Sequence, residues 1–336
     1  MVSQRSAGVL VEPCVLETLT PNASRRGLSR PAPAISAEAG RHERPFSEYA
    51  RAFEAGVPAK LDLVEPWVRL EEGGVLIDVG TGCGGVAARL AAVRRDATVI
   101  AVDNLPGMLD EARNRHRGHP NLHFVACDAE EFSDADEADT VMLLSLLHEV
   151  YAYGGRTLVP VAHAIERSAA RLKPRGRLLI RDFVRPRAAD RLVLLHHGHA
   201  DVRPGRSFAD FATASPYAVR LDSVQTRTDE VVYETTLGDC YEYLFRKDYT
   251  TTWTCELSER YGFWTSAEAV RLVSDTGLIV RHAVEIHNTW VHENRVSGRV
   301  IVRDPRDGSP VPLELSQLFL VAEKPAGREP AGDTWE

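Results

Sequence analysis

Short hydrophobic runs alternate with amphipathic stretches over residues 75–185 of the chain. The hydrophobic runs have the length of β-strands, and the stretches between them repeat apolar side chains at helical spacing. This alternation predicts β-α units built around a mostly parallel sheet. The predicted strands are 75–79, 99–103, 122–128, 140–145 and 177–184, and the clearest predicted helices are 86–93 and 157–172.

The pattern changes after residue 185. Residues 186–264 are rich in aromatic and polar side chains without regular alternation, which predicts a large insertion after the fifth strand. Such insertions are usually lids or substrate walls. A dimer contact is the alternative, and the two uses can coexist. Regular structure returns with a capping box at Thr265 and Glu268, followed by predicted strands at 278–286 and 317–323.

A glycine-rich loop follows the first predicted strand. Gly80, Gly82, Gly84 and Gly85 stand between that strand and helix 86–93. Glycines let the backbone approach a ligand closely and the helix N-terminus offers free N–H groups, so the loop suits a nucleotide-like ligand. The loop alone does not select the ligand, because Gly80, Gly82 and Gly85 also fit the dinucleotide pattern G-x-G-x-x-G. An ordinary crossover with a glycine turn is a third reading.

Acidic residues at the first three strands narrow the choice. Asp78 lies within the first strand, two residues before the first glycine, where its carboxylate can reach a cationic amino group. Asp103 closes the second strand at the spacing expected of a carboxylate that binds ribose hydroxyls. Asp128 closes the third strand, and Ala129 follows it.

These residues together resemble the class I S-adenosylmethionine (SAM) methyltransferases over roughly residues 75–185. The resemblance implies an α/β, Rossmann-like fold: a mostly parallel sheet with helices on both faces and an antiparallel last strand. It implies SAM as the cofactor, with the glycine loop around the methionine part, Asp103 at the ribose and Asp128 at the adenine. Tyr49 lies in a helix that often caps the SAM pocket in this family, so it is a lid candidate, with a plain core role as the alternative. The predicted cofactor-binding residues are Tyr49, Asp78, Gly80, Gly82, Gly84, Asp103, Asn104, Asp128, Ala129 and Ser145.

The chain is accordingly divided into six predicted parts. Composition predicts flexible ends, and helical periodicity predicts cap helices ahead of the first strand. The parts are a flexible segment at 1–44, cap helices at 45–74, a SAM-binding core at 75–185, the insertion at 186–264, the rest of the core sheet at 265–324 and a flexible tail at 325–336.

The residues that follow the fourth and fifth strands are the candidates for the chemistry, because ligands of an open parallel sheet bind at the carboxyl ends of its strands. His148 and Glu149 are acid/base candidates, since a histidine titrates near neutrality and a carboxylate beside it can tune its pKa. The Leu-Leu-His-Glu segment also resembles a turn of small-molecule O-methyltransferases, where the histidine often has a structural role. His148 is therefore a base or a pocket scaffold, and Asp182 contacts the substrate or supports such a residue. The predicted catalytic residues are His148, Glu149, Tyr151 and Asp182.

Composition narrows the range of partners. The chain has 336 residues, 44% of them hydrophobic, which is ample for a buried core. A net charge of −8 without a basic stripe argues against a nucleic-acid partner. No apolar run approaches the ~18 residues of a membrane span, and the broken N-terminal apolar patch makes a poor signal peptide. These features predict a cytoplasmic protein without a membrane partner.

Two histidine groups are candidate metal sites. One group, in the insertion, is His196, His197 and His199; the other, after the sixth strand, is His287 with His292 and Glu293. Metal-assisted methyltransferases use imidazoles and carboxylates to orient an oxygen substrate. Neither group has a context that requires a metal, and the five cysteines lack the spacing of a zinc cluster, so the sequence predicts no metal.

The leading prediction for the activity is transfer of a methyl group from SAM to an oxygen, nitrogen or carbon of a small molecule, with S-adenosylhomocysteine as the second product. The alternative uses the 3-amino-3-carboxypropyl group instead, by transfer or by cyclisation of SAM to azetidine-2-carboxylate, and releases methylthioadenosine. A non-catalytic SAM-binding protein is a third reading. A homodimer and a role in secondary metabolism are further predictions.

Overall fold

The computed structural model describes residues 54, 56–131, 137–249 and 252–326. The predicted flexible segment 1–44 and the lid candidate Tyr49 lie outside these residues, as does most of the predicted tail.

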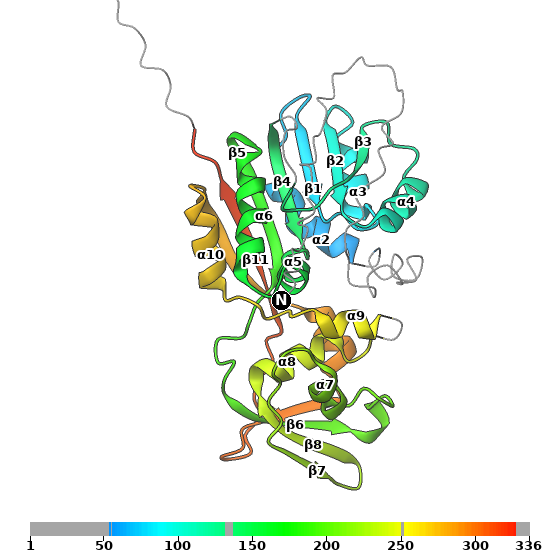
Figure 1. The fold of residues 1–336 in the computed structure, drawn as a ribbon, viewed down its shortest axis with the longest axis vertical. Coiled ribbons are helices and arrows are strands. Elements are labelled where there is room, and N and C mark those ends of the chain that lie inside the picture. The colour runs from blue at the N-terminus through cyan, green and yellow to red at the C-terminus, as the bar shows by residue number, and fades with distance from the viewer. Residues whose placement is uncertain (1–53, 55, 132–136, 250–251, 327–336) are drawn as a thin grey trace, which may run out of the picture.

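A seven-stranded sheet forms the larger half of the molecule (Figure 1). Its strand order is β3-β2-β1-β4-β5-β11-β9. The neighbouring strands from β3 to β5 pair in parallel, whereas β11 pairs antiparallel with both β5 and β9. The predicted fold class, with its antiparallel last strand, is confirmed. The strands are β1 (Val75–Val79), β2 (Thr98–Asp103), β3 (Leu122–Ala126), β4 (Ala138–Leu144), β5 (Leu172–Phe183), β9 (Ile279–His287) and β11 (Ser316–Glu323).

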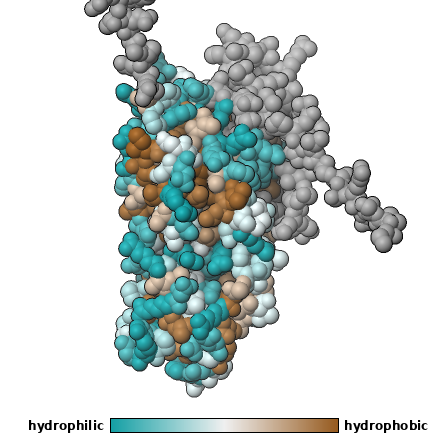
Figure 2. All heavy atoms as spheres, turned by 60° about the vertical axis from the view of Figure 1, so that its left-hand side comes forward, coloured by the Kyte–Doolittle hydropathy of each residue, from teal (hydrophilic) through white to brown (hydrophobic). Residues whose placement is uncertain are grey.

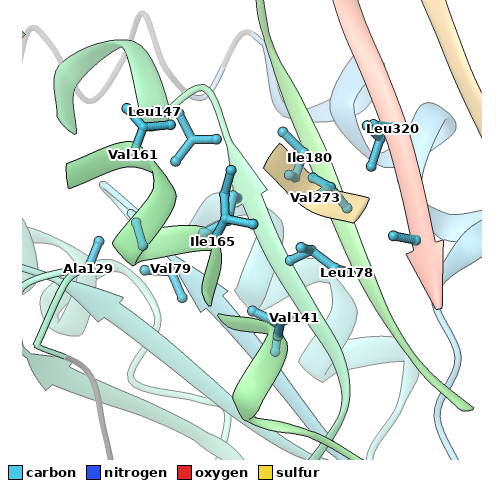
Figure 3. Packing of buried hydrophobic residues seen from close by; sticks show 14 of the residues in the cluster. Val79, Ala129, Val141, Leu147, Val161, Ile165, Leu178, Ile180, Val273 and Leu320 are labelled. Carbon is cyan, nitrogen blue, oxygen red and sulfur yellow. The ribbon is translucent and has the colours of Figure 1, made fainter. Parts of the chain in front are cut away.

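Helices cover both faces of this sheet because its strands are apolar on both sides. Successive residues of β1 point to opposite faces. Ile77 packs in one cluster with Val161 and Val273, which lie on two of the helices of that face. Figure 3 shows Val161 and Val273 in this cluster. Leu76 packs in another cluster with Val64 and residues of α3. The helices of this half are α2 (Val57–Val64), η1 (Glu65–Trp67), α3 (Gly85–Val93), α4 (Pro106–Arg115), α5 (Leu147–Tyr153), α6 (Leu158–Ala170) and α10 (Ser266–Asp275).

A second, antiparallel sheet of four strands lies beyond the carboxyl end of β5, in the order β10-β6-β8-β7 (Figure 1). Its own core buries Phe208, Phe211 and Tyr243. Strand β10 comes from the range 265–324, so part of that range joins the insertion's sheet and not the core sheet, in contrast to the expectation. The elements are β6 (Leu192–Gly198), η2 (His199–Asp201), α7 (Phe208–Ala214), β7 (Ser223–Thr226), β8 (Glu230–Thr236), α8 (Leu237–Arg246), α9 (Trp253–Ser258), α11 (Thr289–Val291), η3 (His292–Val296) and β10 (Val300–Arg303).

The start of β5 differs from its predicted position. Leu172 pairs with Ala138, and the next pair of this ladder joins Arg177 to Thr140. Four residues therefore separate the two pairs on β5 while a single residue separates them on β4. Residues 173–176 thus form a bulge within the strand.

The surface gives no sign of a membrane span within the described segments, because no helix there is long and apolar enough to cross a bilayer. On the face shown in Figure 2, hydrophobic side chains lie in separate patches with polar residues between them. Ile279 and Val284 are exposed on β9, the edge strand of the large sheet. Scattered apolar side chains of this kind are normal on a protein surface.

Candidate cofactor and acceptor site

The loop between β1 and α3 has a backbone that glycine adopts most easily. Gly80, Gly82 and Gly84 have φ angles of 72°, 56° and 74°, in the left-handed region that disfavours side chains. A Cβ atom on Gly80 would lie 2.6 Å from the side chain of Leu146, so the loop also has no room for one there. The loop leads directly into the N-terminus of α3, whose N–H groups favour an anionic or polar ligand. It is the cradle that the sequence predicts for the methionine part of SAM.

Asp103 stands at the end of β2, next to this loop. Its Oδ2 accepts a hydrogen bond from the backbone N–H of Gly82 at 2.8 Å, and its Oδ1 accepts one from Leu105 at 3.0 Å. The side chain is only 9% exposed. The carboxylate therefore fixes the shape of the glycine loop from the position where a ribose is predicted to bind.

Asn104 and Asp128 link the ends of β2 and β3. The amide of Asn104 donates to Asp128 Oδ2 at 3.0 Å, and the backbone N–H of Glu130 donates to Asp128 Oδ1 at 3.1 Å. Ala129 is buried between these partners. β3 ends at Ala126, so Asp128 lies in the loop beyond the strand, and the predicted cofactor residues of this edge are close together.

Asp78 and Lys60 bring opposite charges close enough to act on each other's pKa. Asp78 is buried in β1 and accepts a hydrogen bond from Thr81 Oγ1 at 2.8 Å. Burial raises the pKa of Asp78 to about 6, although Thr81 and the charge of Lys60 favour its ionised form. Burial and the charge of Arg181 lower the pKa of Lys60, on α2, to about 8. Such a pair suits the ammonium and carboxylate of an amino-acid group.

The sequence analysis missed Lys60. Its one available signal was scarcity, because lysine occurs only four times in the chain and Lys60 is the one that precedes the first strand. Nothing in the local pattern shows that α2 packs against the glycine loop, so the contact of Lys60 with the pocket depends on tertiary structure.

Ser145 follows β4 in a conformation that is uncommon for a residue with a side chain, with φ of 63°. Its backbone N–H donates to the carbonyl of Arg181 at 2.6 Å, and its Oγ accepts a hydrogen bond from the Arg181 guanidinium at 2.7 Å. Arg181 also donates to Gln317 on β11 at 2.6 Å. The hydroxyl predicted to contact the cofactor is thus held by β5.

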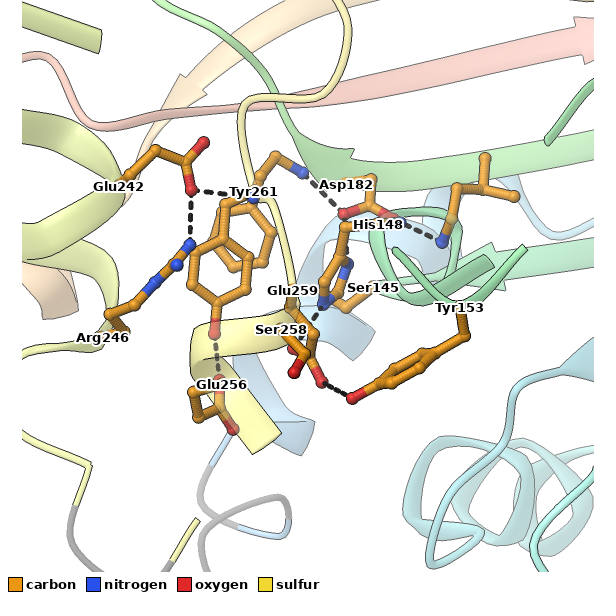
Figure 4. A network of polar contacts seen from close by, with 12 residues as sticks. Ser145, His148, Tyr153, Asp182, Glu242, Arg246, Glu256, Ser258, Glu259 and Tyr261 are labelled. Atoms are coloured by element: carbon orange, nitrogen blue, oxygen red, sulfur yellow. Dashed lines mark hydrogen bonds and ion pairs between the residues drawn. The ribbon is translucent and has the colours of Figure 1, made fainter. Parts of the chain in front are cut away.

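A buried pair joins the end of β5 to the helix that follows β4. Asp182 is fully buried and accepts a hydrogen bond from Nδ1 of His148 at 2.8 Å and from the backbone N–H of Leu147 at 2.7 Å (Figure 4). Nδ1 therefore carries a proton, and Nε2 faces Glu259 of the insertion. Burial alone lowers the pKa of His148, but Asp182, with Glu259 and Glu149, outweighs it and raises the pKa to about 9.

Glu259, which the sequence analysis also missed, faces His148 from the insertion. It follows α9 and is 2% exposed. Its Oε2 lies 3.7 Å from His148 Nε2, and the Tyr153 hydroxyl donates to its Oε1 at 3.3 Å (Figure 4). The acidic residues among the aromatic side chains of the insertion were a signal, but charged residues in an irregular segment are normally solvated.

The other two predicted catalytic residues lie on the same short helix, α5. Glu149 is half-buried and is close enough to His148 to raise its pKa. The ring of Tyr151 lies against that of Phe263, with centroids 5.3 Å apart and planes tilted by 33°, and packs against the core of the large sheet. The structure thus brings His148, Glu149 and Asp182 together, while Tyr151 turns to a packing contact.

Buried charges hold the segment that carries Glu259. Glu242 on α8 pairs with Arg246 and accepts hydrogen bonds from the backbone N–H groups of Tyr261 at 3.1 Å and Gly262 at 2.6 Å (Figure 4). The Arg246 guanidinium lies over the ring of Tyr261, 4.8 Å from its centroid. The ring of Tyr261 in turn lies 5.2 Å from that of His148. The insertion is therefore fastened onto the site by specific contacts.

The two histidine groups considered as metal sites bind other partners. His196, on strand β6, faces Glu230 at 3.1 Å, and His287 donates to the carbonyl of Glu314 at 2.5 Å. His199 donates to the carbonyl of Arg227 at 2.8 Å. Neither group assembles three candidate ligands. Within the part of the chain that the structure describes, the set that does so is His148, Glu149 and Glu259.

Comparisons with known proteins agree with a methyltransferase core. Residues 76–176 match the family described as a methyltransferase domain. The ubiquinone/menaquinone biosynthesis C-methyltransferase UbiE of Geobacter sulfurreducens is 31% identical over 127 residues, which cover 36% of this chain and 46% of that protein. The demethylmenaquinone methyltransferase of Clavibacter sepedonicus is 32% identical over 160 residues, 46% and 60% of the two chains. The release factor glutamine methyltransferase of Escherichia coli is 28% identical over 156 residues, 40% and 56%.

The chain spans less than two thirds of the length of these curated relatives. Among solved structures, the N-methyltransferase NodS of Bradyrhizobium japonicum is similar over 84% of this chain and 98% of its own, with a TM-score of 0.39 and 13% identity.

The chain therefore carries a class I SAM-dependent methyltransferase domain, a transferase domain whose cofactor is SAM. The residues present fit that cofactor, since the glycine loop leaves no room for a Cβ atom at Gly80 and the acid at the end of β2 already faces the loop.

SAM binding is expected to weaken at low pH through Asp78. Its pKa of about 6 means that the carboxylate is ionised above pH 6 and attracts the SAM ammonium, and that it protonates below. Affinity measured by isothermal titration calorimetry should fall by up to about tenfold per pH unit below that value. The Asp78→Asn variant has no carboxylate to protonate at this position. It should bind SAM less tightly than the wild type, and its affinity should not fall in this way with pH. An equal slope in both proteins would exclude Asp78 as its source.

Proposed function

We propose that this protein transfers the methyl group of SAM to a small-molecule acceptor, which binds between the carboxyl ends of β4 and β5 and the insertion. The methyltransferase domain at residues 76–176 supports the reaction. Because the sulfonium already activates its methyl carbon, alignment of the acceptor with that carbon is the main task of the protein, and such positioning can supply about 7–11 kcal/mol.

The observation that carries the proposal is the position of the His148–Asp182 pair. The pair lies at the carboxyl ends of β4 and β5, at the same end of the sheet as the glycine loop. Ligands of such sheets bind at this edge. In the proposal His148 and Glu149 are the residues nearest the acceptor, Asp182 orients His148, and the cofactor lies over Asp78, Asp103 and Asp128.

The surroundings of His148 favour a compact organic acceptor. The rings of Phe183 and Tyr261 both lie 5.2 Å from the imidazole, and Phe245 packs behind them. Enclosure by aromatic rings suits a small, partly apolar molecule. The net charge of −8 also disfavours a nucleic-acid acceptor. A protein acceptor is the competing reading, because one relative is by its name a release factor glutamine methyltransferase.

The homodimer, the cytoplasmic location and the role in secondary metabolism stay predictions. The aminocarboxypropyl alternative receives no support from the relatives, whose names describe methyl transfer.

The test is mass spectrometry of SAM incubated with purified protein and with a cell extract split by size. S-adenosylhomocysteine that forms with the low-mass fraction, together with a product heavier by one methylene unit, supports the proposal. A methylated product in the macromolecular fraction alone would show that the acceptor is a macromolecule and not a small molecule. Formation of methylthioadenosine would exclude methyl transfer. His148→Ala should retain SAM binding and lose turnover.

A further inference from the structure

Three side chains from two distant parts of the chain converge beside the end of β4. His148 and Glu149 lie on α5, and Glu259 comes from the insertion. One nitrogen or oxygen atom of each lies within 4.8 Å of the others. His148 and Glu259 are buried and Glu149 is half-buried, so the three groups meet at the wall of the site and not on the open surface.

The separation of His148 and Glu259 is that of an ion pair, and it is also close to that of two ligands of one ion. Nε2 and Oε2 are 3.7 Å apart, too far for a hydrogen bond. Two atoms about 2.1 Å from a common metal ion in tetrahedral geometry are separated by about 3.4 Å. We propose that His148, Glu149 and Glu259 bind a divalent transition-metal ion, of the Mn²⁺ or Zn²⁺ type, at the acceptor side of the site.

The contacts behind these ligands are those of a metal site. A histidine that binds a metal almost always donates its other ring N–H to a carboxylate or carbonyl, which fixes its tautomer. Asp182 accepts that hydrogen bond from His148 at 2.8 Å and is itself held by the backbone N–H groups of Leu147 and Phe183. Tyr153 holds the other ligand, Glu259. Rigid support of this kind keeps the ligand atoms aimed at one point.

The ligand set also indicates which ion binds and what it does. One imidazole with two carboxylates favours Mn²⁺, Fe²⁺ or Zn²⁺ over Mg²⁺ or Ca²⁺, which prefer oxygen ligands throughout. The two carboxylates offset the charge of a divalent ion. Three protein ligands leave coordination positions open, as in catalytic and not structural sites. An acceptor oxygen at such a position would lose its proton more readily and be held in place.

This inference rests on the proposed function only for the role of the ion, since metal binding is measured without turnover. The experiment is isothermal titration of metal-free full-length protein with Mn²⁺ and with Zn²⁺, together with elemental analysis of the protein as purified. One equivalent is expected to bind. Glu259→Gln and Glu149→Gln should each weaken binding by at least about tenfold, because even the outer partners of a metal ligand are worth about 10- to 100-fold.

Glu256→Gln is the matched control. Glu256 is also buried and lies three residues before Glu259, but it bonds to Tyr261 and is not part of the cluster. The Glu256→Gln variant should bind the ion with the affinity of the wild type. Absence of binding to the wild type, or equal affinity in Glu259→Gln and the wild type with both proteins folded by circular dichroism, would overturn the inference.

A chelator distinguishes failure of the metal site from failure of the proposed function. Chelated protein that still forms S-adenosylhomocysteine at the full rate would overturn the role of the ion and leave methyl transfer intact. Loss of turnover that returns with Mn²⁺ or Zn²⁺, in the wild type but not in Glu259→Gln, would support the inference.

Discussion

Replacing Asp182 with alanine is expected to lower the free energy of unfolding by about 3–5 kcal/mol, the range for removal of one partner of a buried charged pair. Asp182 is fully buried and accepts hydrogen bonds from His148 Nδ1 and from the backbone N–H groups of Leu147 and Phe183. The alanine variant leaves these donors buried without an acceptor, and each such donor costs about 1–3 kcal/mol. Denaturant unfolding followed by circular dichroism measures the loss.

The Asp182→Asn variant distinguishes the contribution of the negative charge to stability from that of the hydrogen bonds. Its amide oxygen can still accept from backbone N–H groups, so part of the stability should return, while the imidazole loses its anionic partner. Asp110→Ala removes an exposed carboxylate from α4 and should be nearly neutral. If Asp182→Ala unfolded at the same denaturant concentration as the wild type, the buried pair would have no part in stability.

Asp103→Ala is expected to weaken SAM binding by 100-fold or more. Hydrogen bonds to a charged group contribute about 1.5–3 kcal/mol each, and a ribose offers two hydroxyls to the carboxylate. Loss of both corresponds to about 3–6 kcal/mol, at about 1.4 kcal/mol per tenfold change in affinity. The variant also removes the acceptor of the Gly82 N–H group, which loosens the glycine loop. Isothermal titration calorimetry with SAM gives the ratio of dissociation constants.

Two variants test the reason for that loss. Asp110→Ala again supplies the control, because it removes the same charge farther along α4 without touching the loop. Asp103→Asn keeps an acceptor for one backbone N–H and should lie between the alanine variant and the wild type. Unchanged affinity in Asp103→Ala would remove Asp103 from the ribose site.

The cofactor half of the site was predictable because its residues lie in short local segments. Asp78 lies within a strand, Asp103 ends one and Asp128 follows one, and the glycines stand directly after the first of these strands. Period-two and period-3.6 patterns locate such strand ends well. The structure places Asp78, Asp103 and Asp128 near the carboxyl ends of the parallel strands, together with the glycine loop. Even here, the predicted third strand ended at Asp128, two residues beyond the observed end of β3 at Ala126.

The acceptor half was predictable only in part. His148 follows strand four and Asp182 lies at the end of strand five, so their approach to the same end of the sheet followed from the order of the strands. The position of Glu259 could not be predicted from the sequence. It is 106 residues beyond its partner Tyr153, and nothing in the neighbouring sequence indicates that it is buried. Lys60 was missed for the same reason. A buried charge and a solvated one look alike in a sequence.

By itself, the sequence determined that this protein has a Rossmann-like methyltransferase core with a glycine loop after its first strand, since strand, loop and helix periodicities are local properties. The tertiary structure alone decided that β10 pairs with β6 in the insertion's sheet and that Glu259 meets His148 and Glu149. These contacts depend on which distant surfaces exclude water together, and hydrophobic periodicity shows which face of an element is buried but not what covers it.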